Sequence, residues 1–272
     1  MTTNTEQQNA AVADRKLLAQ SAYSDGRHLA ARQSIYRWQQ PRYDLPGMVT
    51  EELAGTHGTV VDIGCGNGKF VSRLRKDRPD LRVVGVDVSE GILAEVENPV
   101  LVADAQTLPL AEGAADAVLA LHMLYHVGDV PATVQELARV LRPGGVVIAS
   151  TNSATDKREM DQLWKRAAGD VLGIPEGPTR VSLSSRFSLE AAPDLLGTAF
   201  SDIRVRKLPG IIEVTDPAPV VAHLASYEAW AEQCGVPFGE TVARARELVA
   251  DAISSAGSFR VTCLGGILIC RR

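Results

Sequence analysis

Residues 60–70 read VVDIGCGNGKF, and this stretch decides the fold. It begins within a short apolar run, Thr59–Ile63, and continues through glycines at positions 64, 66 and 68 into a segment suited to a helix. Glycine has no Cβ atom, so it permits a tight turn and lets a ligand touch the backbone. The succession of strand, glycine loop and helix predicts a nucleotide-binding turn.

The spacing of the three glycines separates two classes of nucleotide site. The dinucleotide fingerprint is G-x-G-x-x-G, and its third glycine allows close packing of helix on strand. Here the third glycine comes one position early, and Lys69 stands where the fingerprint has glycine. The stretch follows the form D-x-G-x-G-x-G instead, starting at Asp62. This spacing disfavours a nicotinamide dinucleotide.

Short apolar runs alternate with amphipathic segments after the glycine loop. Because the runs are apolar throughout, both faces of each strand are expected to be covered, as in a parallel sheet. An apolar stripe at helical spacing follows Asp129, which is placed to cap the helix. We predict an α/β fold, with a doubly wound, mostly parallel seven-stranded sheet, helices on both faces and a helical cap. The runs are Thr59–Ile63, Arg82–Val86, Val100–Ala103, Ala117–Leu121 and Val146–Ser150.

The chain is expected to divide into four segments. The polar start, MTTNTEQQNAAVAD, predicts a disordered tail at residues 1–14. An N-terminal helical lid is expected at 15–54, and a Rossmann-like cofactor-binding core at 55–154. The remaining residues, 155–272, are expected to complete the sheet and to insert helices that cap the pocket.

Composition limits the classes of function that fit the sequence. The 272 residues are 45% hydrophobic and 22% charged, which is typical of a globular protein. A net charge of −5 disfavours a broad nucleic-acid surface, which needs clustered Lys and Arg. No apolar run reaches the ~20 residues of a membrane span, and the start lacks a signal-peptide core. The four cysteines form no C-x-x-C pair. We therefore expect a cytoplasmic protein with no membrane or nucleic-acid partner and no metal.

Two acidic landmarks follow the glycine loop. Asp87, in VVGVDVS at residues 83–89, ends the second strand about twenty residues beyond the loop, where a carboxylate can bind both ribose hydroxyls. Its alternative role is to cap the next helix, although Ser89 is already placed to do so. Asp104 lies in VADAQTLP, residues 102–109. With these landmarks, residues 58–151 resemble the class I, Rossmann-like S-adenosylmethionine-dependent methyltransferases, especially those acting on small molecules and natural products.

The resemblance implies that S-adenosylmethionine is the cofactor and S-adenosylhomocysteine the product. It also implies which residues bind the cofactor. Tyr23 has two open interpretations: its ring covers the sulfonium of the cofactor, or it packs between helices. The other implied residues are Gly64, Gly66 and Gly68 around the methionine and ribose, Asp62 and the Leu121 backbone near the methionine ammonium, Asp87 with Val88 after the second strand, and Asp104 with Ala105 at the adenine.

The strand Ala117–Leu121 runs into HMLYHV, residues 122–127, where methyl donor and acceptor are expected to meet. Methyl transfer is an in-line displacement, so alignment supplies much of the rate, and a positioned base adds to it for a protonated acceptor. Histidine titrates near neutral pH and suits that task. We take His126 as the first candidate base and His122 as the second, with a structural role as the alternative for His126.

The sequence thus predicts methyl transfer to an O, N or C atom of a small metabolite, with secondary metabolism as a candidate setting. Two alternatives stay open: an enzyme that uses S-adenosylmethionine for another reaction, and an RNA methyltransferase. The expected partner is the small-molecule acceptor, and the expected state is a monomer or homodimer. Asn152 has no accompanying Asp, so the magnesium set of catechol-type enzymes is not expected.

Overall fold

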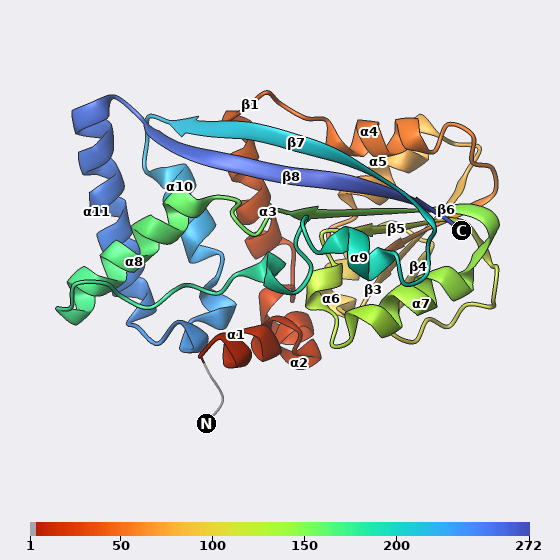
Figure 1. Ribbon diagram of the computed structural model, residues 1–272, viewed down its shortest axis with the longest axis horizontal. Helices are drawn as coiled ribbons and strands as arrows, with labels where there is room; N and C mark the ends of the chain where they lie inside the picture. The colour runs from red at the N-terminus through yellow and green to blue at the C-terminus, as the bar shows by residue number, and fades with distance from the viewer. Residues whose placement is uncertain (1–3) are drawn as a thin grey trace.

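The apolar runs form the parallel strands at the centre of an eight-stranded sheet (Figure 1). The computed structural model describes residues 4–272. Five neighbouring strands are parallel, in the order β6-β5-β2-β3-β4. They are β2 (Thr59–Ile63), β3 (Arg82–Asp87), β4 (Val100–Val102), β5 (Ala115–Leu121) and β6 (Leu141–Asn152).

Strand order reverses beside β2, which pairs with β3 on one side and β5 on the other. Ligands of doubly wound sheets bind at such a switch point, beyond the carboxyl ends of the strands. The glycine loop follows β2 and the segment 122–127 follows β5. Both segments therefore reach the same crevice.

Helices cover both faces of the parallel strands and pack their apolar side chains against them. Val61, Val118 and Val147 point to one face, where they pack with helix α7 (Val130–Val140) and helix α9 (Ala192–Leu196). The alternate residues of the same strands pack on the other face with helices α4 (Leu45–Glu52) and α5 (Lys69–Asp77). Burial on two faces explains why these strands read as continuous apolar runs.

Three antiparallel strands complete the sheet beyond β6: β8 (Phe259–Arg271), β7 (Asp202–Val214) and β1 (Gln39–Gln40). The predicted count of seven strands was wrong by one, because β1 adds a two-residue edge strand to β7. Two glutamines make no apolar run, so the sequence carried no sign of this strand.

Strands β7 and β8 pair along their whole length, but β6 pairs only with residues 265–271 of β8. The rest of this two-stranded ribbon projects past the parallel strands, as Figure 1 shows at the upper left. A third apolar cluster forms there, around Trp164, Trp230 and Val261. It includes residues of α8 (Arg158–Leu172), α10 (Ala218–Ala225) and α11 (Phe238–Ala256). The ribbon is thus the support of the helical cap.

The expected disordered tail at residues 1–14 is corrected by helix α1 (Asn4–Val12), while residues 1–3 lie outside the described part of the chain. Val12 is fully buried, and the Trp230 indole donates a hydrogen bond to the Ala11 carbonyl at 3.2 Å. The segment has no apolar stripe, so its order comes from these tertiary contacts. The other segment boundaries stay an interpretation.

Three further α-helices are α2 (Arg15–Leu17), α3 (Arg27–Ser34) and α6 (Glu90–Leu93). A π-helical turn, η1 (Leu18–Ala22), and short 3-10 segments complete the described helices: η2 (Ile35–Trp38), η3 (Leu124–His126), η4 (Leu183–Arg186), η5 (Glu228–Trp230) and η6 (Glu232–Cys234). Helices α1, α2 and α3 lie on the carboxyl-end side of the parallel strands (Figure 1). Within residues 4–272, no helix is both long enough and apolar enough to cross a membrane.

Candidate active site

A cavity of about 430 Å³ lies at the carboxyl ends of the parallel strands, within the size range of small-molecule sites. The glycine loop and the segment 121–128 form its floor, and α3 with the residues before it form its cover. Cap residues including Lys157, Arg180 and His223 line the far end. One cavity therefore joins the predicted cofactor site to the cap.

Two glycines keep the loop after β2 close to its neighbours. Gly64 and Gly66 have φ angles of +68° and +54°, in the left-handed region that favours glycine. A Cβ atom on Gly64 would lie 2.6 Å from the Cβ of Met123, and one on Gly66 would lie 2.9 Å from a methyl of Leu29. The cavity wall here is therefore backbone, which leaves peptide groups available to a ligand.

All but one of the residues that the sequence assigned to cofactor binding line this cavity. The exception is Gly68, which stands at the start of α5 with a left-handed backbone. Val88, Ala105 and Leu121 line the wall between the loop and the segment after β5. The structure thus brings together residues from four strand ends.

Asp87 ties the end of β3 to the glycine loop. One carboxylate oxygen accepts a hydrogen bond from the Gly66 amide at 2.9 Å, and the other accepts one from the Ser89 amide at 3.0 Å. Ser89 caps α6 through the Ile92 amide, so Asp87 is not the cap of that helix. Burial raises the pKa of Asp87, against the effect of these hydrogen bonds. Each oxygen retains a lone pair for a further donor.

Asp62 is the most isolated acid of the cavity. It is 1% exposed, and one of its carboxylate oxygens has no hydrogen-bond partner among the described residues. Burial, with a smaller contribution from the charge of Asp87, raises the pKa of Asp62 to about 8. A buried oxygen without a partner is costly, so this geometry indicates a site for a cationic group.

The Asp104 end of the cavity is partly closed by the N-terminal segment. Asp104 accepts a hydrogen bond from the Gln106 amide at 2.9 Å and pairs with Arg15 at 3.1 Å. Arg15 belongs to α2, so this ion pair joins the N-terminal helices to the core. The pair is partly exposed and contributes little to stability by itself.

His122 has a strained backbone and a free imidazole. Its φ of +54° is unusual outside glycine, and its amide donates to the Ser150 carbonyl at 3.0 Å. Within residues 4–272, its ring nitrogens have no hydrogen-bond partner. Burial, with a smaller contribution from Lys157, lowers the pKa of His122 to about 4. The ring is neutral at pH 7 and lines the cavity. Strain of this kind is common at functional sites.

His126 also lines the cavity, but both of its ring nitrogens have partners. Nδ1 lies 2.9 Å from the Val12 carbonyl and must donate to it, so Nε2 accepts from the Tyr23 hydroxyl at 2.7 Å. Burial lowers the pKa of His126 to about 3. His126 therefore fastens the N-terminal segment to the core. The free imidazole near the strand end is that of His122, the second candidate.

Tyr23 combines the two interpretations that the sequence left open. Its ring lines the cavity and lies edge-on to His126, with the ring centroids 5.2 Å apart. It also packs against Arg32, whose guanidinium carbon is 4.9 Å from the centroid of the Tyr23 ring. Burial raises the pKa of Tyr23, which keeps its hydroxyl protonated as a donor.

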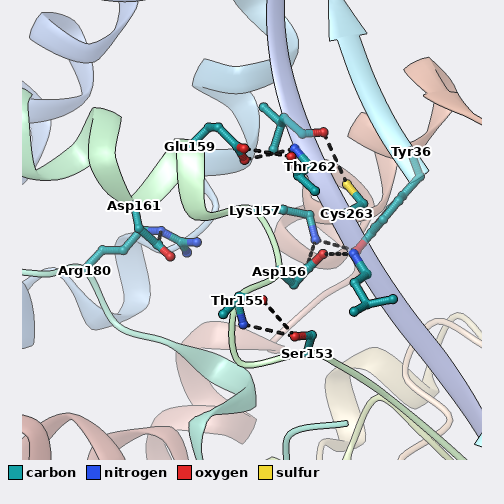
Figure 2. A network of polar contacts seen from close by, with 12 residues as sticks. Tyr36, Ser153, Thr155, Asp156, Lys157, Glu159, Asp161, Arg180, Thr262 and Cys263 are labelled. Carbon is teal, nitrogen blue, oxygen red and sulfur yellow. Dashed lines mark hydrogen bonds and ion pairs between the residues drawn. The ribbon is translucent and has the colours of Figure 1, made fainter. Parts of the chain in front are cut away.

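The cap end of the cavity holds polar residues that the sequence did not assign. Figure 2 shows Lys157 beside Asp156 and Tyr36, and Arg180 against Asp161. The Lys157 ammonium donates to the Tyr36 hydroxyl at 2.7 Å, and Lys157 has a left-handed backbone, with φ of +60°. These residues come from separate segments without a shared motif. Only the folded chain brings them together.

A family model described as a methyltransferase domain matches residues 61–149. The match runs from β2 to β6 and includes the glycine loop, Asp87 and Asp104. Residues 61–149 therefore form a methyltransferase domain of the class I, S-adenosylmethionine-dependent type. The cofactor of this methyltransferase is S-adenosylmethionine.

Known proteins resemble the methyltransferase at the level of sequence. The malonyl-[acyl-carrier protein] O-methyltransferase of Hahella chejuensis is 28% identical over 216 residues, which are 70% of this chain and 76% of the relative. The 27-O-demethylrifamycin SV methyltransferase of Amycolatopsis mediterranei is 35% identical over 113 residues, which are 36% of this chain and 41% of that protein.

A solved structure agrees with the fold. Phosphoethanolamine N-methyltransferase 2 of Haemonchus contortus, in complex with phosphomonomethylethanolamine and S-adenosylhomocysteine, superposes with a TM-score of 0.55 at 16% identity. The superposition covers 100% of this chain and 60% of that one. At this identity the likeness supports the α/β architecture alone.

Proposed function

We propose that this methyltransferase transfers a methyl group to an O, N or C atom of a small metabolite bound at the cap end of the cavity. The observation that carries the proposal is that groups of opposite charge line the two ends of this cavity. A buried acid with an unpaired oxygen, Asp62, lies at the end with the glycine loop, and a buried cation that has no acid partner among the described residues, Arg32, lies at the cap end. The two ends suit two different ligands that meet between them.

The residues at the loop end fit S-adenosylmethionine. In this proposal the unpartnered oxygen of Asp62 accepts the methionine ammonium, near the Leu121 backbone, and Asp87 accepts the ribose hydroxyls beside Val88. Gly64 and Gly66 leave room for the methionine and ribose, and Gly68 shapes the start of the helix behind them. Asp104 and Ala105 bind the adenine, and Tyr23 covers the site.

When bound, the cofactor supplies an activated methyl group on a sulfonium. The protein's own task is to align the acceptor with that group and to exclude water. His122 is neutral at pH 7 and can accept a proton from an acceptor hydroxyl. A weak base suffices, because methylation makes that proton far more acidic. His126 and Tyr23 hold the cover closed.

The relatives favour an oxygen acceptor as the first to be tested. Both are named as methyltransferases, one of them explicitly as an O-methyltransferase acting on a malonyl group carried by a protein. The rifamycin relative supports a setting in secondary metabolism. Location in the cytoplasm and a monomeric or dimeric state remain predictions from the sequence.

The experiment that tests the proposal is turnover with S-adenosylmethionine carrying a deuterated methyl group. Hydroxylated and carboxylated metabolites are supplied as acceptors, and mass spectrometry follows S-adenosylhomocysteine and the labelled product. We expect equal amounts of the two products, and loss of both in Asp87→Ala. A transformed acceptor without S-adenosylhomocysteine would contradict methyl transfer. Labelling of RNA in place of a metabolite would contradict the small-molecule acceptor.

A further inference from the structure

We propose that the acceptor is a small organic acid whose single carboxylate binds between Arg32 and Arg180 at the cap end of the cavity. The inference deepens the proposed function, on which it rests, by naming the class of acceptor. It starts from the charges and unpaired donors of the cap end.

Arg32 is a buried cation without an acid partner. Its side chain lines the cavity, the residue is 7% exposed, and no carboxylate among the described residues pairs with it. One terminal nitrogen donates to the Ser226 carbonyl at 2.7 Å, and the other has no partner. A guanidinium stays charged inside proteins, so burial without a counter-ion leaves an uncompensated charge. An anionic ligand supplies the missing partner.

Arg180, from another segment, lines the same cavity and packs against the same aromatic ring as Arg32. The guanidinium carbons of Arg32 and Arg180 lie 5.7 Å and 4.9 Å from the centroid of the same ring, that of Tyr227. Arg180 is held by an ion pair with Asp161, with 2.7 Å between the paired atoms (Figure 2). Both guanidinium groups belong to residues that line the cavity, and the planar fork of a guanidinium suits a planar carboxylate.

His223 adds a second unpaired donor to the same end. The residue is 4% exposed and lines the cavity, and its ring forms no hydrogen bond with any side chain of the described residues. Burial, with smaller contributions from nearby cations, lowers its pKa well below the usual value. A neutral imidazole has one N–H to donate and one lone pair to offer. A bound acid would use the donor.

Charge balance selects a carboxylate over a phosphate. Lys157 is paired with Asp156 and Arg180 with Asp161, while His223 is neutral. Arg32 therefore leaves the cap end with an excess of about one positive charge. A carboxylate neutralises this excess, whereas a phosphate monoester carries about −1.5 to −2 charges at pH 7 and would exceed it. The acids of the opposite end, Asp62 and Asp87, lie around the cofactor site.

The test is calorimetric titration of protein saturated with S-adenosylhomocysteine. The probes are straight-chain carboxylates from butyrate to octanoate, each compared with its primary amide, which has the same shape without the charge. Hexyl phosphate is titrated as a dianionic probe. We expect at least one carboxylate to bind about tenfold or more tightly than its amide, and more tightly than the phosphate.

Variants assign the preference to Arg32. Arg32→Gln keeps a donor for the Ser226 carbonyl but removes the charge, and should reduce the preference for the carboxylate to about twofold or less. Arg32→Lys keeps the charge and should retain most of the preference. The control is Arg244→Gln, which removes one positive charge from an exposed pair with Asp170 on the surface. It should bind the probes like the original protein.

S-adenosylhomocysteine affinity is measured first for every variant and reports an intact core. Absence of that affinity in the original protein would contradict the proposed function rather than the class of acceptor. With the affinity intact, two results overturn the inference. One is that no carboxylate binds with a Kd below about 10 mM, or that none binds more tightly than its amide. The other is that Arg32→Gln leaves the preference unchanged.

Discussion

Asp62 shows how a single residue can report the ligand that it binds. Its pKa is raised to about 8 because the carboxylate is buried without a partner. In the free protein it therefore holds a proton over the window from its ordinary pKa to about 8. Since the folded state binds this proton more tightly than the unfolded state, the stability that it contributes falls as pH rises through that window.

Cofactor binding is expected to release this proton. The methionine ammonium requires an ionised Asp62, so S-adenosylhomocysteine should bind more tightly at about pH 7 than at about pH 6. Calorimetry in two buffers of different ionisation enthalpy measures the release directly. Asp62→Asn should abolish it and weaken binding by roughly tenfold or more. The matched control is Asp104→Asn, at the adenine end, which should retain the release. Equal proton release by Asp62→Asn and the original protein would assign the proton to another group.

His122 is expected to act in the chemical step for an acceptor that loses a proton. His122→Ala should lower kcat by about 10²-fold while leaving the affinity for S-adenosylhomocysteine unchanged. The imidazole must be neutral to accept a proton, and its pKa is lowered to about 4. Protonation of His122 should therefore not lower kcat as pH falls from 7 to about 5, and kcat should decline only toward pH 4.

The control for His122 is His57→Ala, because His57 is exposed on the surface. It should preserve kcat at every pH. A His122→Ala enzyme with unchanged kcat would leave His122 as a structural residue whose strained backbone serves the turn after β5.

At the scale of elements, the N-terminal segment acts as a cover held by specific hydrogen bonds. The Tyr23 hydroxyl and the Val12 carbonyl both bind the ring of His126, which follows β5. Arg15 adds an ion pair to Asp104. These contacts link α1 and α2 to the core across the cavity, so closure of the cover and occupation of the cavity should be coupled.

Tyr23→Phe removes one of these hydrogen bonds and little else. We expect the free energy that favours the closed cover to fall by about 1 kcal/mol. This loss corresponds to an increase of about fivefold in the KM for S-adenosylmethionine. Hydrogen exchange in residues 4–26 should become faster. Tyr43→Phe is the matched control, because its hydroxyl donates to the Pro209 carbonyl at 2.8 Å outside the cavity. Equal exchange and equal KM in the two variants would argue against a closing role for Tyr23.

The full length of strands β7 and β8 could not be predicted from the local sequence. The local sequence favours a strand only at Ile203–Val205 and Gly265–Cys270, whereas both strands run for 13 residues. Pro209 and Gly210 lie in the middle of β7, and both residue types normally argue against a strand interior. Pairing of β7 with β8 overrides that local preference.

At the scale of the whole molecule, the parallel core was predictable because burial on two faces leaves a continuous apolar run in β2, β3, β5 and β6. Asp62, Asp87 and Asp104 were placed by motif, and the structure brings all three to one cavity. The cation-rich end was not predictable, since its members are isolated in sequence and their partners depend on tertiary packing. His122 and His126 illustrate the same limit. They are four positions apart, and only the docking of Val12 and Tyr23 separates a free imidazole from a bound one.

The measurement that tests the central claim most directly is calorimetric titration of the purified protein with S-adenosylhomocysteine and, in parallel, NADH. The cavity joins the unpartnered Asp62 to a glycine loop of the methyltransferase form. We predict one molecule of S-adenosylhomocysteine bound per chain, with a Kd of the order of micromolar, and no heat with NADH. Binding of NADH with equal or greater affinity, or no binding of S-adenosylhomocysteine, would contradict the account.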